Sequence, residues 1–530
     1  MFNLSAFLWK CSCYYDYQFY KKNVNRLEKI QLSNLKTILR NAENTDFGNS
    51  YSVNHNWTIQ DFQNNIPISN YNDYQDYINR ITNGKQNVLT KSKIRRLGLT
   101  SGSSGRMKYV PFTDLLASEF TKSISVWIYG LLNSYPKLSK GRFYFSVSPA
   151  GFPENLNENV KIGFDNDGDY LKPWERIFAN QLLVVPEWLS KIQNPEFVMY
   201  ITALRIIAAK DLTLISVWNP SFLHSLLENI VKNKDSLIKD LQYGTISNFD
   251  QIIPSNILNS LKIHDPYRSK ELSKLLRNEI KWENVWKDLT CISLWSDSFA
   301  KYSFEKLKEI FPNVNFESKG VIATEGIFSI PFYENEKEPK LLLAYTSHFY
   351  EFMDEFEKIY LSSQLSIGKE YEIIITTGGG LYRYRIGDRF LITGYYNQIP
   401  ILKFIGRNDD ISDLVGEKIS ELFLRNELLP ELKKYYLTPN NSFLRGNLLE
   451  ERAFYELVIA PSDLGNRKLE LVTLVDTILC RNPHYEYARK IGQLGEVKLS
   501  QMSFESTNQG RSSTTKDRFL RRPIDMTPKP

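Results

Sequence analysis

Apolar residues recur with a helical period in several stretches of the chain, and short β-rich runs lie between them. Spacings of three and four between apolar positions predict amphipathic helices at residues 24–45, 112–134 and 219–243. The first helix is expected to stop before a turn at Thr45–Gly48, and Thr58 and Asp61 have the spacing of a capping box. Apolar and β-branched runs predict strands at residues 143–147, 212–217, 320–323, 341–345, 371–376 and 390–393. Strands that alternate with helices favour an α/β fold.

A polar, turn-rich segment divides the chain into two parts. It begins at Gly406, directly after a predicted strand at residues 401–405, and a new helical pattern starts near Lys418. We therefore expect a large N-terminal domain of residues 1–405 and a smaller C-terminal domain of residues 406–530. A further stretch rich in Ser, Thr, Asn and Gly predicts a loop at residues 506–515.

Composition narrows the class of protein. With 530 residues, 42% of them hydrophobic, the chain is neither disordered nor a small disulfide scaffold. The net charge of +6 is weak, which argues against a nucleic-acid partner, although the last twenty residues hold six basic and two acidic side chains. Four separated cysteines and five scattered histidines predict reduced thiols and no structural metal site. No signal peptide and no apolar run of membrane-spanning length is found, so we expect a soluble, cytoplasmic monomer with no membrane partner.

A Ser/Gly turn at residues 99–112 is the first segment with candidate chemistry. It follows the apolar end of a predicted strand and offers backbone N–H groups and hydroxyls, which suit a phosphate chain. It is not a Walker A loop, because no Gly-Lys-Ser/Thr follows, and it is not a Gly-x-Ser-x-Gly nucleophile elbow. A flexible loop is the alternative interpretation.

The second segment is the end of a buried strand at Thr324-Glu325-Gly326. Ligands bind at the carboxyl ends of strands in α/β sheets, so Glu325 could hold a divalent cation beside phosphates. The alternative is an exposed acid at the end of a strand.

The third segment runs from Thr376 to Asp388 and contains three consecutive glycines, which let the backbone approach a ligand closely. Tyr382–Arg385 alternate like a strand with one aromatic and one cationic face. Asp388 follows a glycine turn and is placed to accept hydrogen bonds from ribose hydroxyls. The alternative is a charged edge hairpin.

These three segments, in this order, resemble the Gretchen Hagen type acyl-acid amido synthetases, the auxin-responsive-promoter family of adenylate-forming enzymes. The similarity covers nearly the whole chain. It is carried by Leu35–Arg40, Asn44–Gly48, Phe62–Tyr71, Tyr77–Arg80, Thr100–Ser104, Ala323–Gly326 and Gly380–Asp388. The resemblance implies a large, luciferase-like N-terminal domain that holds ATP and an acyl acid, and a small mobile α+β C-terminal domain that swings over it.

The resemblance also implies a ligase that forms carbon–nitrogen bonds in two steps. ATP, with Mg²⁺, converts a small carboxylic acid into an acyl-adenylate and pyrophosphate, and an amine or amino acid then takes the acyl group as an amide. No protein nucleophile is needed, in keeping with the absence of a Ser-His-Asp or Cys-His arrangement. Transfer to a thiol such as coenzyme A is one alternative, and a non-catalytic acyl or nucleotide binder is another.

The family's functional residues carry over to matching positions of this sequence. Glu325 falls at the magnesium ion and in the catalytic set, and His224 lies on a predicted helix in the region that lines the acyl pocket. His348 follows a predicted strand and is a weaker candidate. Nucleotide contacts are implied for Thr100, Ser101, Gly102, Ser103, Ala323, Thr324, Glu325, Tyr382, Asp388 and Arg407.

A cation from the C-terminal domain is the last expected element. Lys516 is the catalytic candidate, although the family's Gln-x-Lys-x-Pro-Arg pattern reads Thr-Thr-Lys-Asp-Arg here. Arg518 and Lys418 are alternatives to it. The phosphate loop is shorter than in many plant members, so Arg106 or Lys108 could approach the β- and γ-phosphates or could face solvent.

Overall fold

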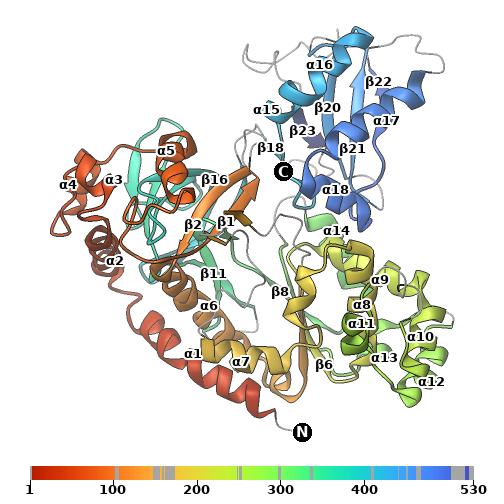
Figure 1. The fold of residues 1–530 in the computed structure, drawn as a ribbon. Helices are drawn as coiled ribbons and strands as arrows, with labels where there is room; N and C mark the ends of the chain where they lie inside the picture. The colour runs from red at the N-terminus through yellow and green to blue at the C-terminus, as the bar shows by residue number, and fades with distance from the viewer. Residues whose placement is uncertain are drawn as a thin grey trace.

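The computed structural model forms three lobes, each around its own hydrophobic core (Figure 1). No helix in the described part of the chain is both long and apolar enough to cross a membrane. The structure describes residues 3–101, 107–146, 155–157, 160–161, 173–246, 249, 253–277, 279–296, 300–334, 338–407, 411–439, 441–448, 452–460, 467–502 and 520–524.

The first lobe is built on a seven-stranded sheet in the order β11-β12-β17-β16-β15-β13-β14, with every neighbouring pair antiparallel. Its strands are β11 (Ser329–Phe332), β12 (Lys340–Leu343), β13 (Phe349–Met353), β14 (Ile359–Leu361), β15 (Glu370–Thr376), β16 (Tyr384–Tyr396) and β17 (Ile399–Arg407). The N-terminal helices and two hairpins pack around this sheet. They are α1 (Leu4–Lys22), α2 (Leu27–Ala42), α3 (Asp46–Ser50), α4 (Ile59–Asn65), α5 (Tyr71–Thr82), α6 (Asp114–Ser134), β1 (Ile94–Ser101) with β2 (Met107–Thr113), and β9 (Ile322–Ala323) with β10 (Gly326–Ile327).

The second lobe has a parallel sheet in the order β3-β6-β7-β8, and its two central strands are fully buried because helices cover the sheet. These strands are β3 (Arg142–Phe145), β6 (Leu212–Ser216), β7 (Cys291–Leu294) and β8 (Asn315–Ser318), and a short hairpin pairs β4 (Asn155–Asn157) with β5 (Val160–Lys161). Its helices are α8 (Pro195–Ala208), α9 (Pro220–Lys232), α10 (Lys234–Tyr243), α11 (Ser255–Leu261), α12 (Pro266–Leu275), α13 (Trp282–Val285) and α14 (Lys301–Ile310), whereas α7 (Pro173–Leu182) packs against α1 (Figure 1).

The third lobe contains a mixed sheet in the order β22-β21-β20-β23, and its core is made by residues between Leu414 and Leu520. A small hairpin of β18 (Ile411–Ser412) and β19 (Ile419–Ser420) leads into it from the first lobe (Figure 1). The other elements are α15 (Glu421–Phe423), α16 (Leu429–Leu432), β20 (Ser442–Asn447), β21 (Phe454–Ile459), α17 (Arg467–Leu479), α18 (Pro483–Lys490), β22 (Lys498–Gln501) and β23 (Leu520–Ile524).

Most elements expected from periodicity are confirmed, and the α/β class is confirmed. The capping box forms as predicted: the Thr58 hydroxyl accepts from the Asp61 N–H, and the Asp61 carboxylate accepts from the Thr58 N–H. Two expectations about the helices were wrong. The turn expected at Thr45–Gly48 is the start of α3, capped by the Thr45 hydroxyl, and the helix expected at residues 219–243 breaks at Asn233 into α9 and α10.

The alternating strand predicted for Tyr382–Arg385 does not form. Strand β16 begins at Tyr384, and Arg383 adopts a left-handed backbone with φ of 47°. The Arg383 side chain is buried, pairs with Glu351 at 3.0 Å and donates to backbone carbonyls of the first lobe. The cationic face expected from the sequence therefore does not form, because Arg383 is in a buried ion pair and Arg385 pairs separately with Glu372 at 2.8 Å.

Candidate active site

An ion pair joins β16 to the end of β17, with the Asp388 side chain buried and the Arg407 side chain 19% exposed. Asp388 and Arg407 stand directly opposite each other in the strand register, and Arg407 Nε donates to Asp388 Oδ1 at 2.5 Å. Burial alone would lower the pKa of Arg407, but Asp388, followed by Glu325 and Asp413, raises it above its ordinary value. These three carboxylates therefore lie within electrostatic range of one guanidinium.

Glu325 lies at the turn between β9 and β10, where its side chain is 5% exposed. Burial raises the pKa of the Tyr384 hydroxyl, and the Glu325 carboxylate adds to this effect. Lys108 lies on strand β2, where burial lowers the pKa of its ammonium and the Glu325 carboxylate opposes this shift. The Lys108 ammonium lies 5.2 Å from the centre of the Tyr71 ring. The turn therefore brings Glu325 close to a lysine of the first hairpin.

Lys418 approaches from the other side, on the turn between β18 and β19. Its backbone is left-handed, with φ of 49°. Burial and then Arg407 lower the pKa of Lys418, and three carboxylates, those of Asp413, Glu325 and Asp388, oppose this. The same turn is fixed by the buried Glu417 carboxylate, which accepts from two backbone N–H groups at 2.8 Å and from the Tyr455 hydroxyl at 2.6 Å.

Five side chains from separate segments thus form one charge cluster: Lys108, Glu325, Asp388, Arg407 and Lys418. Its cations suit a polyphosphate, and its carboxylates suit a ribose and a metal ion. No group of three or more His, Cys, Asp or Glu side chains is arranged to hold a metal among the described residues. A magnesium ion at Glu325 would accordingly need phosphate oxygens and water as further ligands, which is the usual arrangement for Mg²⁺ with nucleotides.

The segment expected to bind phosphates begins beside this cluster. Thr100 and Ser101 end strand β1, where Thr100 is the register partner of Lys108 and Ser101 that of Met107. Thr324 and Ala323, on the hairpin that carries Glu325, are half-buried. The remaining expected residues, Gly102, Ser103, Arg106, Lys516 and Arg518, lie outside the described residues.

Tyr382 is the expected nucleotide residue whose side chain does not reach the cluster. It is fully buried, its hydroxyl donates to the Leu89 carbonyl at 2.6 Å, and its ring stacks on Phe47 at 4.3 Å. The structure corrects the expectation that this ring contacts a nucleotide, because the side chain belongs to the core of the first lobe.

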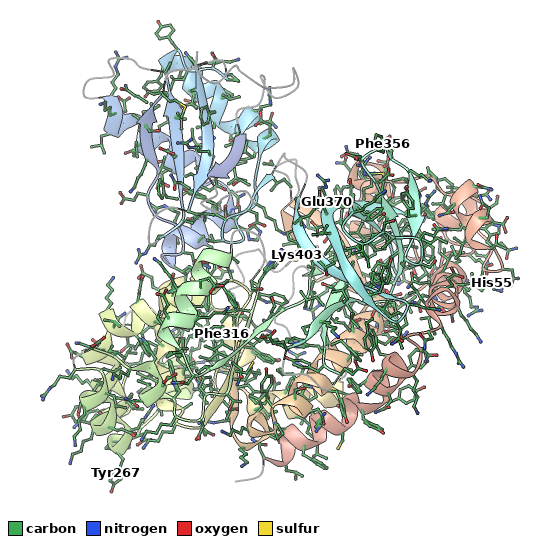
Figure 2. All side chains as sticks on the ribbon, turned by 180° about the vertical axis from the view of Figure 1, so that it is seen from behind. His55, Tyr267, Phe316, Phe356, Glu370 and Lys403 are labelled. Atoms are coloured by element: carbon green, nitrogen blue, oxygen red, sulfur yellow. The ribbon has the colours of Figure 1, made fainter. Side chains whose placement is uncertain are left out.

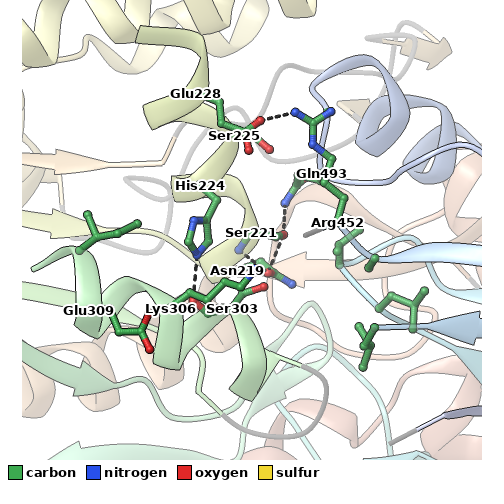
Figure 3. A pocket seen from close by; sticks show the side chains of 16 residues that line it. Asn219, Ser221, His224, Ser225, Glu228, Ser303, Lys306, Glu309, Arg452 and Gln493 are labelled. Atoms are coloured by element: carbon green, nitrogen blue, oxygen red, sulfur yellow. Dashed lines mark hydrogen bonds and ion pairs between the residues drawn. The ribbon is translucent and has the colours of Figure 1, made fainter. Parts of the chain in front are cut away.

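His224 lines a cavity of about 310 Å³ between the second and third lobes (Figure 3). Its Nε2 lies 3.0 Å from the Ser303 carbonyl, and burial lowers the pKa of its ring. An ion pair between Glu228 and Arg452 and a 3.0 Å hydrogen bond from Gln493 to Ser221 cross this cavity from one lobe to the other. No member of the charge cluster lines it, so a role of His224 at the acyl acid stays a prediction.

The contact between the buried residues His348 and Glu119 was not predicted from the sequence. His348 Nδ1 lies 2.8 Å from Glu119 Oε2, and the two residues are 229 positions apart in the chain. Glu119 was not singled out from the sequence, and the signal that could have found it is its place on the buried face of α6, where apolar residues dominate. A carboxylate there needs partners, because an unpaired buried charge is costly.

The charge on Lys418 can be measured through a neighbouring histidine. Burial, then the positive charge of Lys418, lowers the pKa of His484 to about 4, and Asp413 opposes this. The folded state therefore binds this proton less tightly than the unfolded state, so this residue makes the free energy of unfolding fall as the pH drops from the ordinary value of 6.5 toward 4. We expect Lys418→Gln to raise the pKa of His484, measured by NMR titration of the ring protons. An unchanged pKa would show that Lys418 does not lie beside this ring.

Comparison with solved structures defines the class of fold. The chain matches a 2-hydroxyisobutyryl-CoA ligase in complex with an acyl-AMP and CoA, with a TM-score of 0.52 and 12% identity over 94% of this chain and 89% of that one. It matches the AtGH3.15 acyl acid amido synthetase in complex with 2,4-DB, with a TM-score of 0.69 and 18% identity over 98% of this chain and 94% of that one. The chain thus has the fold of these two enzymes.

Comparison of sequences gives the family. The GH3 family N-terminal domain matches residues 16–316, which is more than half of the chain, and the GH3 family central domain matches residues 341–407. The chain belongs to the GH3 family. It is 25% identical to indole-3-acetic acid-amido synthetase GH3.4 of Arabidopsis thaliana, over 75% of this chain and 70% of that protein. It is 24% identical to jasmonoyl–L-amino acid synthetase JAR6 of Nicotiana attenuata, over 74% of this chain and 71% of that protein.

Proposed function

We propose that this protein is an ATP-dependent acyl-acid amido synthetase. One observation carries the proposal: Lys108, Glu325, Asp388, Arg407 and Lys418 come together from separate segments of a GH3 family chain. Its relatives include proteins named indole-3-acetic acid-amido synthetase and jasmonoyl–L-amino acid synthetase, and both names describe the coupling of a carboxylic acid through an amide.

In the first step a carboxylate oxygen attacks the α-phosphorus of ATP. A bond forms between that oxygen and phosphorus, the bond to the bridging oxygen breaks, and pyrophosphate leaves. Because two anions must meet, the step depends on cations and on positioning. Lys108 and Lys418 neutralise phosphate charge, Asp388 accepts from the ribose hydroxyls and holds Arg407, and Glu325 would hold Mg²⁺. The ion would supply charge neutralisation at the phosphates.

In the second step an amine nitrogen attacks the acyl carbon. The carbon–nitrogen bond forms, the bond to the phosphate oxygen breaks, AMP leaves and the nitrogen loses a proton. No residue of the chain forms a covalent bond to the substrate in either step. Lys516 remains a predicted catalytic cation, and Lys418 is the cation of the third lobe that reaches the described cluster.

We also propose the domain division that the sequence predicts, with residues 1–405 as the binding domain and residues 406–530 as a mobile lid. The core of the third lobe supports this boundary, since its residues lie between Leu414 and Leu520. The polar crossing contacts, Glu228 with Arg452 and Ser221 with Gln493, are of a kind that can break and re-form.

Product analysis tests the proposal and separates it from transfer to a thiol. The purified protein is given ATP, Mg²⁺ and a panel of aromatic, fatty and amino-acid carboxylates, with a mixture of amino acids in one arm and coenzyme A in the other. Mass spectrometry should find an amide, with AMP formed in equal amount. A thioester as the sole product would move the assignment to the thiol branch.

A further inference from the structure

The hairpin that carries Glu325 is short. Its strands pair Gly326 with Ala323 and Ile327 with Ile322, and such a hairpin is marginally stable by itself. The precise place of the Glu325 carboxylate therefore depends on groups outside the hairpin.

His348 supplies one of these groups. The Ile327 N–H donates to His348 Nε2 at 3.1 Å, so this nitrogen carries no proton and the ring proton sits on Nδ1. Nδ1 donates to Glu119 Oε2 at 2.8 Å. The His348 side chain is 0% exposed and that of Glu119 is 3% exposed, so both partners fix the tautomer and the angle of the ring.

Glu119 connects His348 to the glycine-containing segment that runs from Thr376 to Asp388. Its carboxylate also accepts from the Gly378 N–H, at 3.0 and 3.1 Å to the two oxygens. Gly378 opens the glycine run that precedes β16, and Thr113 donates to its carbonyl at 2.9 Å. One carboxylate of α6 thus connects the segment that leads to Asp388 with the hairpin that carries Glu325.

The imidazole lies directly behind the turn. A Cβ placed on Gly326 would come within 3.0 Å of His348 Nε2 and 2.5 Å of Ile375 Cδ1, so a larger residue here would press on the imidazole and displace the end of the Ile375 side chain. The Tyr350 hydroxyl donates to the Ile327 carbonyl at 2.5 Å. Both backbone groups of Ile327 are therefore held from the sheet side, two residues away from Glu325.

We propose that His348 and Glu119 are positioning residues that hold the Glu325 turn in the geometry needed for adenylation. The proposal rests on the proposed function and extends it to a pair of side chains that touch neither ATP nor acid. In it, the bond from Ile327 to Nε2 fixes the turn, and Glu119 fixes the ring that accepts this bond.

Two substitutions of His348 separate the hydrogen bond at Nε2 from the hydrogen bond at Nδ1. In His348→Gln the amide oxygen takes the place of Nε2 and can still accept from Ile327, whereas in His348→Asn the amide takes the place of Nδ1 and can bond only to Glu119. His55→Asn is the matched control, because it makes the same substitution in another His–Glu pair, the 2.6 Å contact of His55 Nδ1 with Glu43 at the outer edge of the first lobe (Figure 2).

Two readouts are taken on the full-length protein. The first is hydrogen–deuterium exchange of the peptide that contains Ile327, and the second is kcat and KM in carboxylate-dependent ATP–pyrophosphate exchange. We expect His348→Asn to lose protection at this peptide and to lower kcat about thirtyfold with KM for ATP within about threefold. His348→Gln should keep the protection and lose less than about fivefold in kcat, and His55→Asn should change neither.

Equal protection in His348→Asn and wild type would overturn the proposal, as would parallel losses of kcat and melting temperature in both His348 variants. The second result would assign the histidine to stability alone. If the wild type itself shows no exchange with any acid, the proposed function fails, while hydrogen–deuterium exchange still decides whether His348 holds the turn.

Discussion

Asp388→Ala is expected to lower kcat/KM for adenylation by about a thousandfold. The substitution removes the acceptor for the ribose hydroxyls and leaves the Arg407 guanidinium without the carboxylate that it contacts at 2.5 Å. Loss of one preorganised electrostatic partner costs about 10²–10³ in rate, and breaking a buried pair costs about 3–5 kcal/mol. The measurement is pyrophosphate exchange with varied ATP, together with thermal unfolding of the same preparations.

Two further variants keep this prediction independent of folding. Asp388→Asn retains the shape and an oxygen for Arg407, so we expect a smaller loss of stability than in the alanine variant but still a loss of about a hundredfold in kcat/KM. Glu370→Ala is the matched control, since it breaks the exposed 2.8 Å pair with Arg389 next to Asp388 on the same strand (Figure 2). It should leave the rate within about twofold. An Asp388→Ala enzyme within tenfold of wild type would remove Asp388 from the site.

Lys418→Met is expected to lower the rate of amide formation by about a hundredfold. Its ammonium lies among Asp413, Glu325 and Asp388, and burial with Arg407 lowers its pKa, so the charge is held in a site of restricted solvation. A cation aimed at phosphate from such a site is worth about 10²–10³ in rate. The measurement is the rate of AMP and amide formation at saturating ATP.

Two further variants separate the effect of the Lys418 charge from the effect of changing the turn that carries this residue. Lys418→Arg keeps the cation and should recover at least about a tenth of the wild-type rate. Lys434→Met removes an exposed lysine of the same lobe that pairs with Glu431, and it should have no effect. A Lys418→Met enzyme within about threefold of wild type would show that another cation, such as Lys516, serves the reaction.

Local patterns in the sequence were sufficient for the regular elements. The apolar period located α2 and α6, and the spacing of Thr58 and Asp61 located a capping box that forms as expected. The break at Asn233 was missed because the apolar period continues through it from α9 to α10. Periodicity reports which face is buried and says little about where a helix bends.

Long-range partners could not be predicted from local patterns. Arg383 was expected on a cationic strand face. Its side chain is instead buried, because it pairs with the buried Glu351 and donates to carbonyls of the first lobe, and its backbone is left-handed. The Tyr382 ring is likewise buried by contacts with Phe47 and Leu89, which lie far away in the chain. Asp388 and Glu325 could be proposed, because their motifs are short and specific.

The central claim is that the charge cluster activates a carboxylic acid as its adenylate. Carboxylate-dependent ATP–pyrophosphate exchange, measured over the panel of acids with the wild type, Asp388→Ala and Glu370→Ala, tests it most directly. The account predicts exchange with at least one acid in the wild type and in Glu370→Ala, and its loss in Asp388→Ala. ATP binding without exchange for any acid would contradict it and would favour a protein that binds nucleotide without this chemistry.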